Sequence, residues 1–380
     1  MKTKAPIVAA VEIGTSKIKV VIGKAKRRSF VILGHGESPS SGVMKGTVFD
    51  FHAASDETYC ALQQAEHNAG VRIDRILLAQ SGDHLGAFYH EASVKISGPD
   101  HIVTADDVAA VTSLARGKAL PEGRILIHQI RRPFRLNRRF VQKPEGLTAE
   151  MLEVGYWFVH GQENKVADHL YVIRGFNVPV DAVILSSLAS GTMVTTAEDR
   201  KKGVLVMDIG GGTTDFVLYR DGYAYMTGVL PVGGEHLTND LSHGLRLTKE
   251  QAEKLKLRFG RATITARDKT EKVWLNGDFA VGDRQFSLQA IERITAARID
   301  EIFQAVFQIV NLKLVLERLD ADIVLTGGTS KLPGITEAAS RVFGTTVRIG
   351  APEGSVYNAL CDPSYSTVLG LLHFVNPECQ

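Results

Sequence analysis

Apolar residues recur in short runs along the chain, and glycine-containing turns separate these runs. Runs rich in Val and Ile predict strands, whereas apolar residues at helical spacing predict helices. The elements predicted in the N-terminal part are three strands, a helix closed by Gly70 and a fourth strand: 7–13, 18–23, 29–37, 56–69 and 76–79. A later part repeats this order, with strands predicted at 204–209, 215–220, 223–229 and 323–325. The repetition predicts an α/β protein with two related mixed sheets covered by helices.

Residues 86–163 break this repeated pattern. Thr104, with Asp107 at the third helical position, marks the start of a helix there. The elements predicted in this stretch are a strand, that helix and two further strands: 92–96, 105–119, 124–131 and 151–160. We expect an inserted small α/β module.

A second irregular stretch, 235–303, follows the repeated strands. Thr248 and Gln251 form the pattern of a capping box at the start of a predicted helix, 248–259. Asn276-Gly277 predicts a hairpin turn between strands. Residues 288–319 are amphipathic, and they predict packed helices rather than a coiled coil, because the seven-residue repeat is not sustained.

The two repeated units carry the same candidate chemistry. Each begins with an apolar run that ends in an acid, Glu12 or Asp208, followed by Ile and a glycine turn. An acid at this place can hold a hydrated magnesium ion. Glycine lets backbone N–H groups approach phosphate oxygens closely. The residues predicted to contact phosphates from the two sides are Gly14, Thr15, Ser16, Lys17, Gly210, Gly211, Gly212 and Thr213. Lys17 is equally well interpreted as a solvated strand residue.

A third glycine turn follows the strand predicted at 323–325 and carries no acid. Its Gly327-Gly328 step leaves bare backbone against which a planar ring can lie, so we assign it to the adenosine end of a nucleotide. Thr329 and Lys331 complete this candidate set. Gly234 and Glu235, where another helix opens, are predicted to face a phosphate or the ribose.

Composition narrows the class of protein. A chain of 380 residues with 44% hydrophobic residues and a net charge of +2 predicts at least two globular domains. No stretch is long and apolar enough for a membrane span, and the apolar N-terminal run predicts a buried strand rather than a signal peptide. Cys60, Cys361 and Cys379 show no metal or pairing pattern and are expected to be reduced thiols in the cytoplasm.

A cluster of arginines has no place in the nucleotide chemistry. Its members fall within nine residues with no acid between them: Arg131, Arg132, Arg135, Arg138 and Arg139. One interpretation is a solvated hairpin rim, and the other is a surface for an anionic partner, either lipid headgroups or an acidic protein. Nucleic acid is not expected, since only two aromatic residues interleave.

These motifs resemble the actin-like ATPase superfamily, which includes actin, heat-shock chaperones, MreB and sugar kinases. Within it the chain resembles the FtsA family of bacterial cell-division proteins, through segments that run along its whole length: 11–21, 38–46, 208–215, 324–334, 347–352 and 365–374. The resemblance implies a duplicated, ribonuclease-H-like fold that binds ATP with Mg²⁺. It also implies that Glu253 and Lys256 reach the ribose and adenine; from their spacing alone they are an exposed ion pair.

The resemblance implies a role as an adaptor of the division ring, peripheral to the inner face of the cell membrane. Its implied partners are the C-terminal tail of the tubulin-like protein FtsZ through 235–303, other division proteins through 86–163, and further copies of itself in a filament. Family members usually continue to an amphipathic anchor helix, which we expect to be absent from this chain, by truncation or naturally. The implied domains are a first core (1–85, 164–200, 358–380), the inserted module (86–163), a second core (201–234, 304–357) and an outer subdomain (235–303).

Hydrolysis is expected to be slow. Superfamily members that turn over ATP well usually place a Glu or Gln after the strand that precedes the second phosphate hairpin. Ser186-Ser187-Leu188 stands there instead, which leaves Asp208 and Asp215 as candidate catalytic residues. Two alternatives remain open: a small-molecule kinase of the sugar-kinase type, and a pilus-assembly or shape-determining actin-like protein. No catalytic base or sugar cleft is signalled for the kinase.

Overall fold

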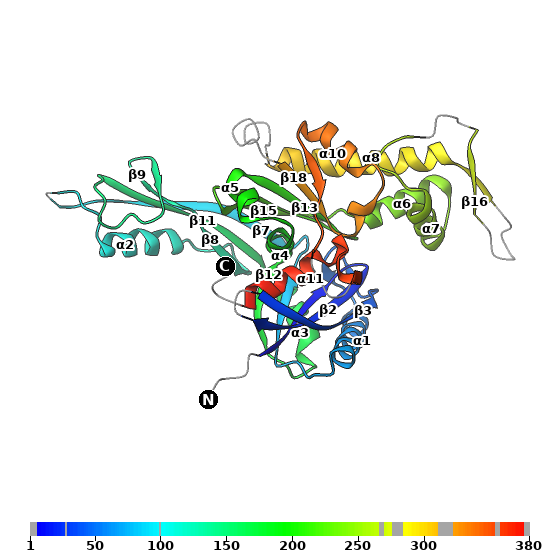
Figure 1. The fold of residues 1–380 in the computed structure, drawn as a ribbon, viewed down its shortest axis with the longest axis horizontal. Helices are drawn as coiled ribbons and strands as arrows, with labels where there is room; N and C mark the ends of the chain where they lie inside the picture. The colour runs from blue at the N-terminus through cyan, green and yellow to red at the C-terminus, as the bar shows by residue number, and fades with distance from the viewer. Residues whose placement is uncertain are drawn as a thin grey trace.

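The computed structural model describes residues 6–26, 29–98, 100–265, 270–275, 284–310, 322–353 and 358–375. It shows an elongated molecule with two five-stranded sheets at its centre, an inserted sheet at one end and a helical part at the other (Figure 1). The predicted turn at 276–277, the part of the predicted helix beyond 310, and Cys379 lie outside the described residues. Cys60 and Cys361 are exposed free thiols.

The two central sheets share one topology. In each sheet, the first three strands along the chain are antiparallel, and two later strands add in parallel beside the first of them. This shared topology confirms the duplication predicted from the sequence. The first sheet has, in spatial order, β12 Val180–Leu185, β6 Arg75–Gln80, β1 Ile7–Ile13, β2 Lys17–Lys26 and β3 Ser29–Pro39. The second has β15 Tyr223–Leu230, β14 Thr214–Arg220, β13 Val204–Ile209, β18 Asp322–Thr326 and β19 Val347–Ile349.

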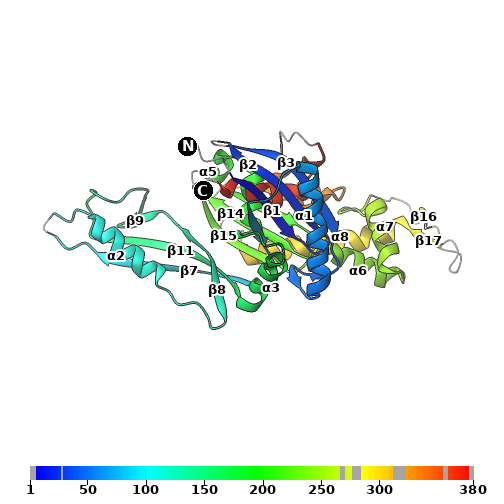
Figure 2. The ribbon, with the colours of Figure 1, turned by 90° about the horizontal axis from the view of Figure 1, so that it is seen from below.

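Helices cover the outer face of each sheet. α1 (Phe51–Ala69) and α3 (Glu163–Arg174) pack on the first sheet, as Figure 2 shows from below. α1 begins at Phe51 rather than at the predicted 56, because Asp50 caps it by accepting a hydrogen bond from the Ala53 N–H. Ala54 in this first turn is already buried in the core of the first sheet. α8 (Leu288–Val310) and α10 (Ile335–Phe343) pack on the second sheet through residues that include Phe303 and Ala338. The short helix α5 Ala197–Lys202 and the two-stranded pair of β4 Val43–Met44 and β5 Thr47–Val48 complete this part of the fold.

Two helices lie between the central sheets. α4 (Ser186–Val194) and α11 (Ser366–Leu371) pack against the first sheet through Val368 and Leu369, and against the second through Leu188 and Val194. Their closest approach is at Gly370, where a Cβ would overlap the Ala189 carbonyl. Glycine is therefore needed for this helix contact. Four short 3₁₀ turns flank these segments: η1 Gly328–Lys331, η2 Asn358–Leu360, η3 Pro363–Tyr365 and η4 Leu372–Val375.

The inserted stretch forms its own sheet with one helix. α2 (Ala105–Arg116) begins at Thr104 with the predicted capping box, and Gly117 follows its last turn. It packs through Val111 and Ala115 on a sheet of β7 Leu85–Lys95, β8 Arg124–Arg131, β9 Phe134–Leu136, β10 Arg139–Val141 and β11 Met151–Gln162. β7 is longer than the predicted strand at 92–96, because it pairs with β11 along its full length, including a half-exposed part without clear alternation.

The far end of the molecule is mostly helical. Its elements are α6 Gly234–Leu245, α7 Lys249–Phe259, β16 Lys272–Leu275, β17 Arg284–Ser287 and α8 Leu288–Val310. The predicted capping box of Thr248 and Gln251 is present at the start of α7. A small core that includes Leu241, Leu255 and Ile291 joins these helices.

Candidate functional site

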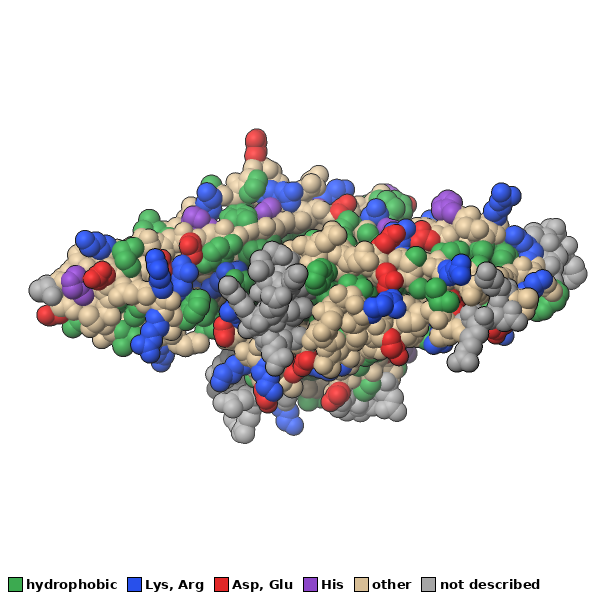
Figure 3. All heavy atoms as spheres, turned by 90° about the horizontal axis from the view of Figure 1, so that it is seen from above, with side chains coloured by type: hydrophobic (Ala, Val, Ile, Leu, Met, Phe, Trp, Pro, Cys, Tyr) green, Lys and Arg blue, Asp and Glu red, His purple; other side chains and the backbone are tan. Residues whose placement is uncertain are grey.

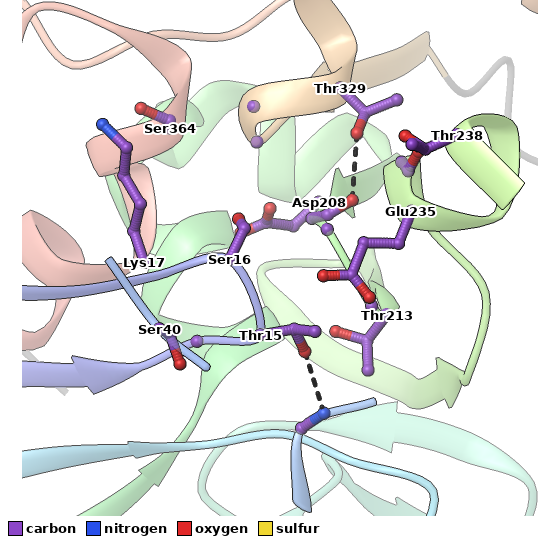
Figure 4. A pocket seen from close by; sticks show the side chains of 18 of the residues that line it. Thr15, Ser16, Lys17, Ser40, Asp208, Thr213, Glu235, Thr238, Thr329 and Ser364 are labelled. Atoms are coloured by element: carbon purple, nitrogen blue, oxygen red, sulfur yellow. Dashed lines mark hydrogen bonds between the residues drawn. The ribbon is translucent and has the colours of Figure 1, made fainter. Parts of the chain in front are cut away.

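One cavity of about 970 Å³ lies between the two halves of the molecule (Figure 4). This volume is of the size that holds a small-molecule ligand. All residues predicted from the sequence to bind nucleotide or cation, or to take part in catalysis, line it: Glu12, Gly14, Thr15, Ser16, Lys17, Asp208, Gly210, Gly211, Gly212, Thr213, Asp215, Gly234, Glu235, Glu253, Lys256, Gly327, Gly328, Thr329 and Lys331. The five clustered arginines do not line it.

The two predicted phosphate turns face and touch each other. A Cβ at Gly212 would overlap the Thr15 side chain, and a Cβ at Gly211 would lie 3.0 Å from the Ser16 hydroxyl. Thr15 Oγ1 in turn accepts a hydrogen bond of 3.2 Å from the Gly46 N–H. The glycines of the second turn therefore do more than present N–H groups, because they also permit the two halves to approach.

The third turn is bonded to the second. Thr329 Oγ1 and the Gly234 N–H both donate to the Gly210 carbonyl, each at 2.9 Å. Gly327 has a φ of +85°, and a Cβ there would overlap the Asp208 carboxylate. At Gly328 a Cβ would meet only Ser364 Cβ, at 3.8 Å, so the backbone face is open on that side. This matches the bare surface expected at the adenosine end.

Three carboxylates stand at the first two turns: Asp215 is buried, and Glu12 and Asp208 are partly buried. Asp208 accepts a hydrogen bond of 2.6 Å from Thr367 Oγ1, and Asp215 accepts one of 2.7 Å from Ser81 Oγ. The second oxygen of Asp215, Oδ1, is buried and has no partner among the described residues. Burial raises the pKa of Asp215 to about 8, and the nearby Asp208 carboxyl adds to the rise. Burial likewise raises the pKa of Asp208 and, against the attraction of Lys19, that of Glu12.

These carboxylates fit a hydrated cation. A positive charge stabilises clustered carboxylates and a buried carboxylate oxygen that has no partner, and Mg²⁺ keeps much of its water shell. Within the described ranges, no group of three His, Cys, Asp or Glu side chains is placed to ligate one ion directly. A cation held by Glu12 and Asp208 through water stays a prediction.

Two lysines of β2 have different surroundings. Lys17, the predicted phosphate cation, forms an ion pair of 2.8 Å with Glu37, and half of its side chain is exposed. Lys19, which sequence reasoning missed, is buried and lies 3.4 Å from Glu12. The signal for Lys19 was the hairpin register, since a turn between Ile13 and Ile18 pairs position 12 with position 19. Lys19 is the lysine that faces the acids.

Glu253 and Lys256 form both the ion pair expected from their spacing and part of the cavity wall. Their charged atoms are 2.7 Å apart. Lys256 Nζ also donates to the Gly234 carbonyl at 3.1 Å and to Thr238 Oγ1 at 2.9 Å. This network ties α7 to the start of α6, so the outer helices are fixed relative to the cavity.

The segment 362–367, which carries part of the family resemblance, fastens both halves around the cavity. Asp362 pairs with Lys331 at 2.8 Å, and Tyr365 donates to Glu37 at 2.9 Å. Thr367, in the same segment, holds Asp208. These roles were invisible in the sequence, because each partner comes from a distant part of the chain.

No water-orienting acid or amide stands at the predicted place. Ser186 lines the cavity, and Ser187 and Leu188 follow it on α4. The amide of Gln80, at the end of neighbouring β6, instead contacts His84 Nε2 at 3.0 Å and does not line the cavity. The structure therefore adds no water-orienting acid or amide at this place to the candidates named from the sequence.

The arginine cluster divides into internal and exposed members. Arg132 lies between the rings of Tyr225 and Tyr89, at 3.7 and 4.0 Å from their centroids. Arg135 pairs with two acids from neighbouring strands, Glu91 at 3.0 Å and Glu153 at 3.2 Å. Sequence reasoning saw no acid nearby because both come from other strands. Arg138 and Arg139 are exposed. On the face shown in Figure 3, basic and acidic side chains are interspersed.

Comparison with solved structures places the fold. The PilM-PilN type IV pilus biogenesis complex contains a chain similar to this one, with a TM-score of 0.68 and 19% identity over 99% of this chain and 100% of that chain. MreB5 of Spiroplasma citri bound to ADP has a TM-score of 0.56 and 14% identity, over 98% and 96%. The fold is therefore actin-like. No helix in the described ranges has the length and apolarity needed to cross a membrane.

Comparison of sequences places the family. A family described as "Cell division protein FtsA" matches residues 205–370, and one described as "SHS2 domain inserted in FTSA" matches residues 82–160. The cell division protein FtsA of Neisseria meningitidis is 32% identical over 98% of this chain and 91% of its own length. That of Bacillus subtilis is 28% identical, over 96% and 82%. The chain belongs to the FtsA family of cell division proteins.

Proposed function

We propose that this protein binds ATP with Mg²⁺ in the cavity and acts as an adaptor that links the FtsZ ring to the inner face of the cell membrane. The observation that carries the nucleotide part is the contact of two glycine hairpins beside three acids that line one cavity. Membership of the FtsA family supports the adaptor role. The sugar-kinase alternative has no such support from the family matches.

Each part of the wall has a role in this proposal. Glu12 and Asp208 would hold Mg²⁺ through water, and the glycine turns at 14–17 and 210–213 would donate to phosphate oxygens. Bound Mg²⁺ would neutralise charge on the phosphates. Gly327 and Gly328 would lie against adenine, while Glu253 and Lys256 would reach the ribose and the base. Asp208 and Asp215 are the candidates for slow hydrolysis.

We further propose that residues 235–303 bind the C-terminal tail of FtsZ. Leu257, Ile264 and Trp274 of this region expose most or about half of their side chains, and exposed apolar side chains of this size are typical of interaction sites. The inserted module, 86–163, is proposed to contact other division proteins. The remaining proposed parts are the two cores, 1–85 with 164–200 and 358–380, and 201–234 with 304–357.

A peptide of the FtsZ C-terminal tail tests the adaptor role. Its binding is measured by fluorescence anisotropy to the wild type, to Trp274→Ala, and to Leu114→Ala, whose leucine is equally exposed on the inserted module. Removal of an aromatic anchor should weaken binding about tenfold or more, and Leu114→Ala should bind like the wild type. Binding that is equal in all three, or absent in the wild type, would contradict the proposed site. We also propose that copies of this chain associate into a filament, which nucleotide-dependent sedimentation of the wild type tests.

A further inference from the structure

The inserted module is attached to one half of the molecule by the chain and to the other half by packing. It begins with β7 and ends with β11, and its two chain connections lead to β6 and α3 of the first half. Its strands β7 and β11, however, lie beside β15, the edge strand of the second sheet (Figure 1). The module therefore spans the boundary between the two halves that enclose the cavity.

One short segment of the module, residues 128–132, contacts both halves. On the side of the first half, His128 Nε2 accepts a hydrogen bond of 3.0 Å from the Leu185 N–H. Burial lowers the pKa of His128 to about 4, so the ring is uncharged at neutral pH and its nitrogen can accept. Leu185 is the last residue of β12, and Ser186, which follows it, lines the cavity. The segment 128–132 is thus bonded to the wall of the cavity on this side.

On the side of the second half, the contact is made by Arg132. Its guanidinium lies between the Tyr89 ring of the module and the Tyr225 ring of β15. It also donates a hydrogen bond of 2.8 Å to the Tyr225 carbonyl, while its Nε atom is buried and has no partner in the described part of the chain. Two of these three contacts depend on Tyr225, so a displacement of that residue would release the guanidinium from the second half.

A buried tryptophan strengthens the same junction. Trp157 of β11 is paired with Ile130 of the segment 128–132, and its Nε1–H donates to Thr227 Oγ1 of β15 at 2.9 Å. The Trp157 side chain also packs in one core cluster with apolar residues of the second sheet. Because β8 and β11 are joined by backbone hydrogen bonds, the contacts of the segment 128–132 to the two halves are held at a fixed separation.

The strand β15 connects this junction to the cavity. It ends at Leu230, and the chain then continues to Gly234, which lines the cavity. Thr214 Oγ1 donates to the Val232 carbonyl at 2.8 Å. The Gly234 N–H donates to the Gly210 carbonyl of the second phosphate turn at 2.9 Å. The same stretch of chain is therefore fixed to the module near its start and to the second phosphate turn at its end.

We propose that the segment 128–132 holds the two halves together, so that the inserted module controls how fast nucleotide leaves the cavity. This inference rests on the proposed nucleotide binding. While Arg132 stays between its two tyrosines, the second half is kept against the first and the phosphate turns remain in contact. When Tyr225 moves away from Arg132, the second half turns away and opens the cavity. Release becomes faster in proportion to the fraction of time that the halves spend apart.

The rate of nucleotide release tests the proposal. A fluorescent ADP analogue is bound with Mg²⁺ and then displaced by excess ATP in a stopped-flow instrument. Arg132→Ala, which changes no residue of the cavity wall, should release the analogue about tenfold faster than the wild type or more. Arg132→Lys keeps the charge but loses the planar stacking, so its rate should lie between the two.

Arg135→Ala is the matched control. Arg135 belongs to the same module, but its ion pairs are with Glu91 and Glu153, which are themselves in the module. Its variant should release the analogue like the wild type. Equal rates in the wild type and Arg132→Ala would overturn the proposal, and so would an equal acceleration by Arg135→Ala. A wild type that binds no analogue refutes the proposed function and this inference with it, whereas binding with unchanged release overturns the inference alone.

A second measurement follows the junction itself in a protein whose arginines are intact. The chain has two tryptophans, so Trp274→Phe leaves Trp157 as the single reporter. Binding of ADP with Mg²⁺ should lower the quenching of Trp157 fluorescence by acrylamide about twofold or more, because a filled cavity keeps the junction closed. Quenching of Trp157 that does not respond to bound nucleotide would overturn the proposal.

Discussion

The hairpins β1–β2 and β13–β14 have the same topology but opposite charges at the position facing their first acid. Both begin with a buried strand, place an acid before an Ile and turn at glycine. The first then offers Lys19 to the cavity, whereas the second offers Asp215. The two hairpins therefore share one backbone path, but one presents a lysine and the other an aspartate at the equivalent position.

The hairpins also differ in how closely they can be approached. The first turn has one glycine, Gly14, followed by Thr15 and Ser16, and the second has three. The side chains of Thr15 and Ser16 occupy the space that Gly212 and Gly211 leave open. The first hairpin thus contributes side chains to the contact between the halves, and the second contributes glycines that leave space for them.

The largest expected effect comes from a substitution that forces the two turns apart. Gly212→Val places a branched side chain where Thr15 lies, so the two turns must separate. Nucleotide affinity should fall by about a hundredfold or more, because donors on the two sides no longer reach the same phosphates. Calorimetry measures the loss, and Gly175→Ala, at a site with open space, is the control. Undiminished affinity in Gly212→Val would show that the turns do not act together.

The free energy of unfolding, measured against pH, tests Asp215, which occupies in the second hairpin the position that Lys19 has in the first. The pKa of Asp215 rises from 3.8 to about 8 on folding, so the native state holds a proton that the unfolded chain releases between these values. This proton's contribution to stability is present at low pH and is lost as pH rises through about 8. Asp215→Asn should therefore be more stable than the wild type at pH 8 by up to several kcal/mol, since each unit of pKa shift corresponds to ~1.4 kcal/mol.

Urea unfolding of the nucleotide-free protein at several pH values measures this difference. The gap between Asp215→Asn and the wild type should narrow as the pH is lowered toward 4. Asp221→Asn, which changes an exposed aspartate in the next turn, is the control. A gap that is independent of pH would mean that Asp215 is not held protonated by its surroundings.

The arginines of the inserted module are predicted to differ in their contribution to stability. Arg132 stacks on two tyrosines and donates to the Tyr225 carbonyl at 2.8 Å, which joins β15 of the second sheet to the insertion. Arg132→Ala should lower the free energy of unfolding by about 2 kcal/mol. Arg138→Ala removes an exposed side chain and should change it by less than about 0.5 kcal/mol. Equal effects in denaturant titrations would contradict this division of the cluster.

Membrane contact is the corresponding test of the exposed arginines. Arg138 and Arg139 could each add on the order of 1 kcal/mol near anionic headgroups, falling off within a Debye length. We expect weak liposome sedimentation that high salt removes and that the double change Arg138→Ser with Arg139→Ser abolishes. Salt-resistant binding, or binding that survives the double change, would rule out the arginines as the attachment.

The smallest signal is expected for ATP turnover. The start of α4 provides no acid or amide to orient water, since Ser186-Ser187-Leu188 stands at that place. The steady-state rate should lie far below the ~1–100 s⁻¹ of kinases. A phosphate-release assay on the wild type and Asp215→Ala measures it. A rate inside that range that is unchanged in Asp215→Ala would reveal a catalytic group elsewhere.

The sequence predicted local features of the fold and site well. Glycine turns after buried strands and the capping boxes at Thr104 and Thr248 depend on neighbouring residues, and the structure contains them. Helix α1 was predicted to start at 56, whereas it starts at Phe51, where Asp50 caps it and Ala54 packs in the core. Features that depend on neighbouring residues along the chain can therefore be predicted from the sequence alone.

Long-range features were not predictable in the same way. The partners of Arg135 come from two other strands, and Thr367 reaches Asp208 from the end of the chain. Neither pairing follows from spacing. Lys19 is an intermediate case, because the short hairpin fixes its register opposite Glu12, yet its burial depends on the segment at 364–365.

Calorimetric titration of the wild type with ATP and with GTP, each with Mg²⁺, is the most direct test of the central claim that the two hairpins form one adenine-nucleotide site. The account predicts saturable binding of one ATP per chain, with GTP about tenfold or more weaker. It also predicts that Gly212→Val abolishes the ATP signal. Equal affinity for GTP, or ATP binding that persists unchanged in Gly212→Val, would contradict the account.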